Sequence, residues 1–236
     1  MKYEHQFLSA FIAVSILTIF LILLGTASYA VGPSPDIFST DSVPYGIHYA
    51  DWLARAWQWS VGIPSNIHPF HNYTPDKCTI HQSGPVWFLP AVPEGKGTVT
   101  QSCTVPAGKA IAFDIESGEC DFGVREIKTD QALVSCAGKG NLPQYITLQA
   151  SIDGVPIPNL KQFRVQSNFF NLTIPPNNIY EADPGTYKAI SSGYFIILKP
   201  LSSGEHIVKY ADQINNPLER QYNHAKSVTY NLHISP

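Results

Sequence analysis

The spacing of apolar residues between positions 45 and 64 is that of an amphipathic helix. Within residues 47–61, aromatic and aliphatic side chains recur three and four positions apart, which places them on one face of a helix. Gly62 and Pro64 follow and end the pattern. The positions on this face are Tyr49, Trp52, Leu53, Ala56, Trp57 and Ser60. The segment 45–64 therefore predicts one amphipathic helix.

Beyond this helix, apolar and polar residues alternate, which is the period of a β-strand. The clearest run is 226–234, whose valine, tyrosine, leucine and isoleucine stand at alternate positions. Eight such runs are separated by turns rich in proline and glycine, at 85–90, 97–103, 109–115, 145–152, 161–174, 194–199, 205–210 and 226–234. The pattern predicts a mainly β protein. Residues 65–236 would form a single disulfide-stabilised β-sandwich or jelly-roll-like domain, with the helix packed on it.

The N-terminal segment 1–30 has the layout of an export signal. Lys2 precedes the uncharged apolar stretch 7–24, and small residues lead to Ala30. The sequence predicts a signal peptide cleaved after Ala30. A retained membrane anchor is the alternative, because about 18 apolar residues are enough to span a bilayer. In that case the protein would contact the membrane only through this segment. Residues 31–44 are rich in Pro, Ser and Asp and are predicted to be a linker in either case.

Four cysteines and two glycosylation patterns agree with export. Cys78, Cys103, Cys120 and Cys136 permit three pairings. The sequential pairing would close loops of 25 and 16 residues, each contributing about 3 kcal/mol to stability in the chain-entropy model. Asn72 and Asn171 each begin an Asn-x-Thr acceptor pattern for glycosylation. We expect a protein that is secreted or held on the outer face of the cell membrane, in an oxidising compartment.

Composition excludes several classes of protein. Of 236 residues, 15 are Lys or Arg and 18 are Asp or Glu, or 14% charged, against about 25% in ordinary soluble domains. Hydrophobic residues make up 44% of the chain, which excludes a disordered protein. The net charge of -3 argues against a nucleic-acid partner.

Several sequence blocks carry a resemblance to a known family. They are Tyr45-Gly-x-x-Tyr-Ala-Asp-Trp52, Trp57-Gln-Trp59, Gly84-Pro-Val-Trp-Phe-Leu89, Cys103-Thr-Val-Pro-Ala-Gly-Lys-Ala110, Gly193-Tyr194 and Leu201-Ser-Ser-Gly-Glu-His206. In this order the blocks resemble a family of uncharacterised exported prokaryotic β-rich proteins. The resemblance implies export and a β-rich domain. It implies no particular activity.

Three histidines form the candidate metal site. His68 and His71 are followed by Cys78 and His81, a spacing similar to that of zinc ligands. A disulfide at Cys78 would leave His68, His71 and His81, which is the ligand count of an open zinc or copper site. The alternative is that these loop histidines are solvated or bonded to the backbone.

The candidate ligand-binding residues are acidic and aromatic. Asp114, Glu116, Glu119 and Asp121 lie within eight residues of one another, and paired carboxylates can move protons or bind calcium. Asp114 and Glu116 would share a strand face, although an acidic turn is most often only solvated. Trp59 and Trp87, if exposed, could stack on a glycan, and core packing is the alternative for both. The sequence predicts four ligand-binding candidates among these groups: Trp59, Trp87, Glu116 and Glu119.

These observations favour a non-catalytic, exported β-sandwich that binds a glycan or an envelope protein at the cell surface. The chain has no Gly-x-Ser-x-Gly elbow, phosphate-binding loop or dinucleotide fingerprint. Two alternatives stay open: a secreted metal-dependent enzyme that uses the histidines, and a structural component of the envelope.

Overall fold

The computed structural model describes residues 35–70, 73–92 and 97–236. The predicted export segment, 1–30, lies outside the described residues, as do His71 and Asn72. No helix in the described part of the chain is long and apolar enough to cross a membrane.

The first of two sheets contains five strands in the order β1-β3-β8-β6, with β7 also paired to β8. All its pairs are antiparallel except β1 with β3, which is parallel. The strands are β1 (Val86–Phe88), β3 (Ala110–Asp121), β6 (Arg164–Gln166), β7 (Phe170–Ile174) and β8 (Gly185–Leu198).

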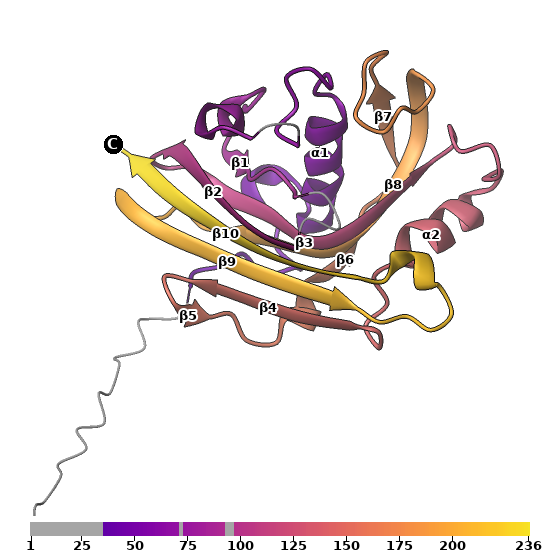
Figure 1. Cartoon of the computed structure of the whole chain (residues 1–236). Helices are drawn as coiled ribbons and strands as arrows, with labels where there is room; N and C mark the ends of the chain where they lie inside the picture. Colours follow the sequence, from indigo (N-terminus) through magenta and orange to yellow (C-terminus); the bar gives the residue numbers. More distant parts are fainter. Residues whose placement is uncertain (1–34, 71–72, 93–96) are drawn as a thin grey trace, which may run out of the picture. The chain divides into compact units, whose positions relative to one another are not determined.

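The second sheet has the order β2-β10-β9-β4-β5. Here β2 and β10 run parallel over ten residue pairs, and the other pairs are antiparallel. The strands are β2 (Gly97–Pro106), β4 (Ile146–Ile152), β5 (Val155–Pro156), β9 (Gly204–Ile214) and β10 (His224–Ser235). The prediction of a mainly β protein with a helix packed on it is confirmed (Figure 1).

Strand β8 occupies the centre of the packing. From Ala189 to Leu198 every residue is buried, which is the pattern of a strand covered on both faces. Helix α1 (Tyr49–Val61) lies over the first sheet, and the second sheet lies on the opposite side (Figure 1). The contact between the sheets includes Phe113 of β3, whose ring stacks on Tyr210 of β9 at 5.3 Å between centroids.

Helix α1 forms where the apolar spacing predicts it. It also forms hydrogen bonds with backbone groups of a strand. The Tyr49 hydroxyl donates to the Phe195 carbonyl at 2.7 Å and accepts from the Ile197 amide at 3.1 Å. Both groups belong to β8, beyond the end of its pairing with β6. Because unpaired buried backbone groups are costly, this hydroxyl fixes the helix to the sheet as well as packing against it.

A second helix, α2 (Asp130–Gly138), corrects the expectation of a single helix. Only Leu133 and Ala137 on it are buried, so its apolar stripe is too narrow to stand out in the sequence. Its start is marked by Thr129, whose side-chain oxygen accepts a hydrogen bond from the Ala132 amide at 3.1 Å. α2 packs on β3 and β8 at the end away from β1 (Figure 1).

The predicted strand 161–174 is also corrected. A 3-10 turn (Leu160–Phe163) and two short strands, β6 and β7, replace it. The break between them falls at Ser167, whose hydroxyl accepts from the Ser191 amide at 3.1 Å. The Ser167 amide also donates to the Ser191 carbonyl at 2.9 Å, so Ser167 stays bonded to β8 through both its backbone and its side chain.

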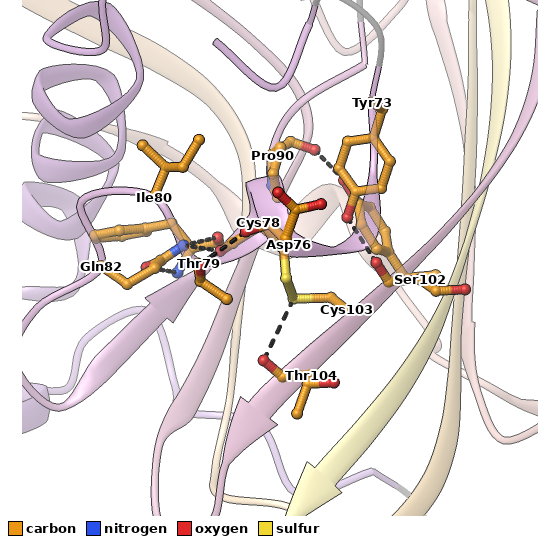
Figure 2. Close-up of a disulfide and its surroundings, with 12 residues drawn as sticks. Tyr73, Asp76, Cys78, Thr79, Ile80, Gln82, Pro90, Ser102, Cys103 and Thr104 are labelled. Atoms are coloured by element: carbon orange, nitrogen blue, oxygen red, sulfur yellow. Dashed lines mark hydrogen bonds between the residues drawn. A yellow bond between two sulfur atoms is a disulfide. The ribbon is translucent and has the colours of Figure 1, made fainter. Parts of the chain in front are cut away.

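The cysteines form the sequential pairs Cys78–Cys103 and Cys120–Cys136. The first bridge ties a short 3-10 turn (Pro75–Thr79) to edge strand β2, and Figure 2 shows Tyr73 beside it. The Tyr73 hydroxyl donates to the Ser102 carbonyl at 2.8 Å, so loop residues cover this strand edge. Two disulfides agree with an oxidising compartment.

Candidate functional site

A cavity of about 480 Å³ opens between α1 and the side of β3. Strand β1 pairs with β3 only from Ala110 to Ala112. Beyond that point, β3 has no described strand neighbour on this side, and side chains line a space that is partly open to solvent. Its walls are mostly aromatic and aliphatic and include Trp57, Trp59, Phe70, Phe88, Leu89, Val92, Phe113, Ile179, Tyr180 and Phe195. The cavity is large enough for a small organic molecule.

The polar residues of the cavity come mainly from one irregular stretch of strand β3. Asp114, Glu116 and Ser117 line it, together with Lys226 from β10 in the other sheet. The pairing of β3 with β8 shifts register between Asp114 and Glu116. Asp114 then pairs with Phe195 and Glu116 with the adjacent Tyr194. Both carboxylates line the cavity, but the shift breaks the simple alternation on which the prediction of a shared strand face rested.

Glu116 belongs to a buried network of charges that joins the two sheets. The Lys226 Nζ lies 2.7 Å from Glu116 Oε2 and 3.4 Å from Asp212 Oδ1. The His224 Nε2 lies 2.8 Å from Asp212 Oδ2 and 3.4 Å from Glu116 Oε2. All four side chains are at most 9% exposed. Two acids and two bases therefore neutralise one another inside the protein.

His224 carries its positive charge within this network. Its Nδ1 lies 2.9 Å from the Tyr222 carbonyl oxygen, and its Nε2 faces the carboxylates of Asp212 and Glu116. Since all of these are acceptors, both ring nitrogens must carry a proton. The Asp212 and Glu116 contacts outweigh burial and raise the pKa of His224 to about 10. Burial alone would raise the pKa of Glu116, but Lys226 and His224 hold it below its ordinary value.

Asp114 stands apart from these pairs. Its Oδ2 accepts a hydrogen bond from the Ser117 hydroxyl, and that hydroxyl in turn accepts from Trp57 Nε1 at 3.0 Å. Its Oδ1 is buried and has no hydrogen-bond partner in the described part of the chain. Burial raises the pKa of Asp114 to about 7, and the nearby Lys226 only partly opposes this rise.

We expect stability to peak in mildly acidic solution and to fall as pH rises. Asp114 has a raised pKa, so the folded state binds more protons than the unfolded state between about pH 4 and 7, and stability falls over that range. The contribution of His224 is fully present below pH 6.5 and is lost as pH rises through about 10. Only part of such shifts is realised as stability, so the free energy of unfolding should drop by about 2 kcal/mol between roughly pH 5 and pH 9.

Urea unfolding followed by tryptophan fluorescence at several pH values measures this decline. Asp114→Asn removes one titrating group and should make the limb between about pH 4 and 7 shallower, while leaving the alkaline limb. Glu119, whose pKa is also raised, to about 8, keeps part of the decline. An unchanged acid limb in that variant would show that Asp114 does not cause it.

The predicted metal histidines have different surroundings. His68 is 1% exposed; its Nε2 donates to the Ser60 carbonyl at 3.0 Å, and its Nδ1 accepts from the Phe70 amide at 3.1 Å. Its ring is therefore held by backbone, which was the alternative reading. His81 is exposed in a turn with a φ of 55°. With His71 outside the described residues, a site built from the three histidines stays a prediction.

A different group of side chains has metal-ligand spacing within the described residues. One ligand atom each from Glu116, Asp212 and His224 lies within 4.8 Å of the others. However, Lys226 already places an ammonium group between the two carboxylates, and His224 is protonated on both nitrogens. A zinc or copper ion would have to displace one cation and deprotonate the other, so this set does not fit a resident metal.

The predicted ligand-binding residues are divided by the fold. Trp59 and Glu116 both line the cavity. Trp87 is 8% exposed and packs in the core, so its ring offers no surface for stacking on a glycan. Glu119 does not line the cavity. Its pKa is raised to about 8, mainly by burial and to a lesser extent by the nearby Asp121 carboxylate. Asn171 is exposed on β7, which leaves its glycosylation a prediction.

One further set of residues resembles the connectivity of a catalytic triad. The His206 Nδ1 lies 2.7 Å from Asp153 Oδ2, and its Nε2 lies 3.2 Å from Ser202 Oγ. The same Nε2 lies 3.0 Å from the Ser202 carbonyl oxygen. The Ser202 carbonyl oxygen can only accept, and it lies closer to Nε2 than the hydroxyl does, so Nε2 is placed to donate to the backbone. The histidine therefore joins two turns and does not activate a nucleophile.

Comparisons with known proteins assign no family. No family model matches the sequence, and no curated protein matches it. Among solved structures, PbICP-C in complex with falcipain-2 is similar over 64% of this chain and 100% of its own, with 11% identity and a TM-score of 0.26. The cysteine protease inhibitor EhICP2 from Entamoeba histolytica is similar over 59% and 95%, with 13% identity and a TM-score of 0.23. At these TM-scores the similarities identify neither a shared fold nor a shared function.

Proposed function

We propose that this chain is an exported, non-catalytic binding protein whose cavity takes a small, largely apolar molecule. The observation that carries the proposal is the aromatic-lined cavity of about 480 Å³ between α1 and β3. Ligand sites in proteins are typically apolar concavities of roughly 300–1,000 Å³ with a few polar groups. This cavity has both features, and the polar groups are gathered near Asp114.

A binding role suits the site better than catalysis. Four charged side chains form ion pairs with one another: Glu116, Asp212, His224 and Lys226. The Ser117 hydroxyl is held between Asp114 and Trp57. Acid–base catalysis needs a group that can exchange a proton with a substrate. These contacts hold the paired groups in one state, and among the described acidic and basic residues of the cavity only Asp114, whose pKa is raised to about 7, titrates near neutral pH.

A small molecule also suits the site better than a glycan. A sugar carries hydroxyl groups on every side, and each one buried needs a hydrogen-bond partner. The cavity walls offer mainly aromatic and aliphatic side chains. Glycans, an envelope-protein ligand and a purely structural envelope role are the alternatives that the following experiment separates.

The test uses the full-length protein, exported to an oxidising compartment, and the neutral fluorescent probe N-phenyl-1-naphthylamine. We expect saturable binding at one site. Ala56→Trp should weaken it at least tenfold, because Ala56 lines the cavity from α1 and an indole would fill the space. Arg55→Trp is the matched control, since Arg55 is exposed on the same helix and the same side chain is introduced outside the cavity.

The N-terminal segment has the same sequence in both variants, so a difference in probe affinity between them reports on the cavity alone. Equal probe affinity in the two variants would contradict the proposal. Absence of probe binding, together with saturable binding of an oligosaccharide from a panel, would favour the glycan alternative. No binding of either kind would leave an envelope-protein ligand or a structural role.

A further inference from the structure

We infer that the molecule taken by the cavity is an organic cation, an amine or quaternary ammonium compound with an apolar body, and that Asp114 is its counter-ion. This inference rests on the proposed function, because it names the ligand class of the same cavity. It is carried by the charge count around the cavity, by the aromatic walls and by the position of Asp114.

Among the charged side chains near the cavity, there is one more carboxylate than there are cations. Asp114, Glu116 and Asp212 are three acids that interact with one another, and His224 and Lys226 are the two bases among them. Lys226 is shared by Glu116 and Asp212, and His224 by the same two acids. Asp114 is therefore the acid without a cation of its own. A proton or a bound cation can supply the missing positive charge.

The cavity that Asp114 lines suits a bound cation. Trp57 and Trp59 from α1 line the same space, as do Phe88 and Tyr180. Aromatic faces attract ammonium groups, by about 0.5–2 kcal/mol for each well-placed ring. They also provide contact area for an apolar body attached to the ammonium group. Trp59 and Phe88 stack on each other, with 5.7 Å between ring centroids, so each has one face left for a ligand. Aromatic walls together with a carboxylate that has no counter-ion of its own suit this class of ligand.

Anionic ligands are disfavoured by the same groups. The only described cationic side chain on the cavity, Lys226, lies 2.7 Å from Glu116. An anion would meet the negative charges of Asp114 and Glu116 with no unshared cation to offset them. A neutral ligand of the same shape could enter the cavity, but it would leave Asp114 to be neutralised by a proton.

A bound cation would compete with a proton for Asp114, so the affinity for the cation should depend on pH. The groups that face Asp114 are Ser117 on its own strand, Trp57 on α1, and the charged side chains of Lys226, Asp212 and Glu116. With its pKa near 7, Asp114 is mostly protonated in mildly acidic solution and mostly ionised in mildly alkaline solution. An alkylamine stays charged over this range, so its affinity should increase as pH rises.

The experiment compares three probes with one apolar body: 2-phenylethylamine, 2-phenylethanol and phenylacetate. Each displaces N-phenyl-1-naphthylamine from the full-length protein. At about pH 8 we expect the amine to bind at least tenfold more tightly than the alcohol, and phenylacetate to bind most weakly. This tenfold difference corresponds to about 1.4 kcal/mol. At about pH 5.5 the preference for the amine should shrink to less than threefold.

Asp114→Asn keeps the size of the side chain and removes its charge, so the amine should lose its advantage while the alcohol keeps its affinity. Asp183→Asn is the control, because it removes an exposed carboxylate that does not line the cavity. Equal affinities of amine and alcohol for the wild-type protein at about pH 8 would overturn the inference and leave the proposed function intact. Retained amine preference in Asp114→Asn would also overturn it. Probe binding that is insensitive to Ala56→Trp would remove the proposed function itself.

Discussion

Replacing Lys226 with methionine is expected to lower the free energy of unfolding by about 3–5 kcal/mol at neutral pH. Lys226 bridges Glu116 and Asp212 at 2.7 and 3.4 Å, and its side chain is 9% exposed. Methionine fills similar volume but leaves two buried carboxylates with only His224 to balance them. Removal of one partner from a buried ion pair is far more costly than replacement of the whole pair. Urea unfolding followed by tryptophan fluorescence measures the loss.

Lys209→Met is the matched control for this prediction. Lys209 is exposed on neighbouring β9, so the same exchange should change stability by less than about 0.5 kcal/mol. A second variant, Glu116→Gln with Lys226→Met, removes one of the unpaired acids and should recover at least about 1 kcal/mol. If Lys226→Met proved as mild as Lys209→Met, the network would not be a buried ionic one.

The buried network shows why the sequence predicts the fold better than the site. An amphipathic stripe is a local signal, because all of α1 lies within 13 residues. Glu116 and Asp212 are 96 positions apart (212 − 116), and they meet only because β3 and β9 belong to sheets that pack face to face. No spacing rule links positions this far apart. Glu116 itself was predicted from its acidic neighbours, without its partners.

A signal for the missing partners was nevertheless present. The sequence pattern ended one predicted strand at 210 and began the next at 226, whereas β9 extends to Ile214 and β10 begins at His224. If the alternation is continued, Asp212 shares the inward face of Tyr210. A charged residue whose position in the alternation places it on the buried face of a strand needs a buried partner. In the pairing of β9 with β10, Lys226 stands directly opposite Asp212.

The shape of the cavity depends on a close approach that sequence spacing also does not reveal. Gly193 of β8 pairs with Ser117 of β3, next to the bulge that places Glu116. A methyl group on Gly193 would lie 2.3 Å from both the Glu116 carbonyl oxygen and the Ser117 Cβ. On its other side, Gly193 pairs with Val165 of β6, so β8 cannot move away from β3. Only glycine allows the two strands to approach this closely.

Gly193→Ala is therefore expected to destabilise the protein by about 3 kcal/mol, the upper end of the usual cost of overpacking. The variant should also bind N-phenyl-1-naphthylamine more weakly, because the strand that carries Glu116 and Ser117 must shift. The matched control is Gly138→Ala at the end of α2, where the nearest atom to the added methyl group is Arg164 Nη2 at 3.4 Å. There, the better helix propensity of alanine should keep the change within about 1 kcal/mol. Urea unfolding and probe titration of both variants measure these effects. Equal stability of the two variants would show that the β3–β8 contact can relax, and that the position of Glu116 does not depend on it.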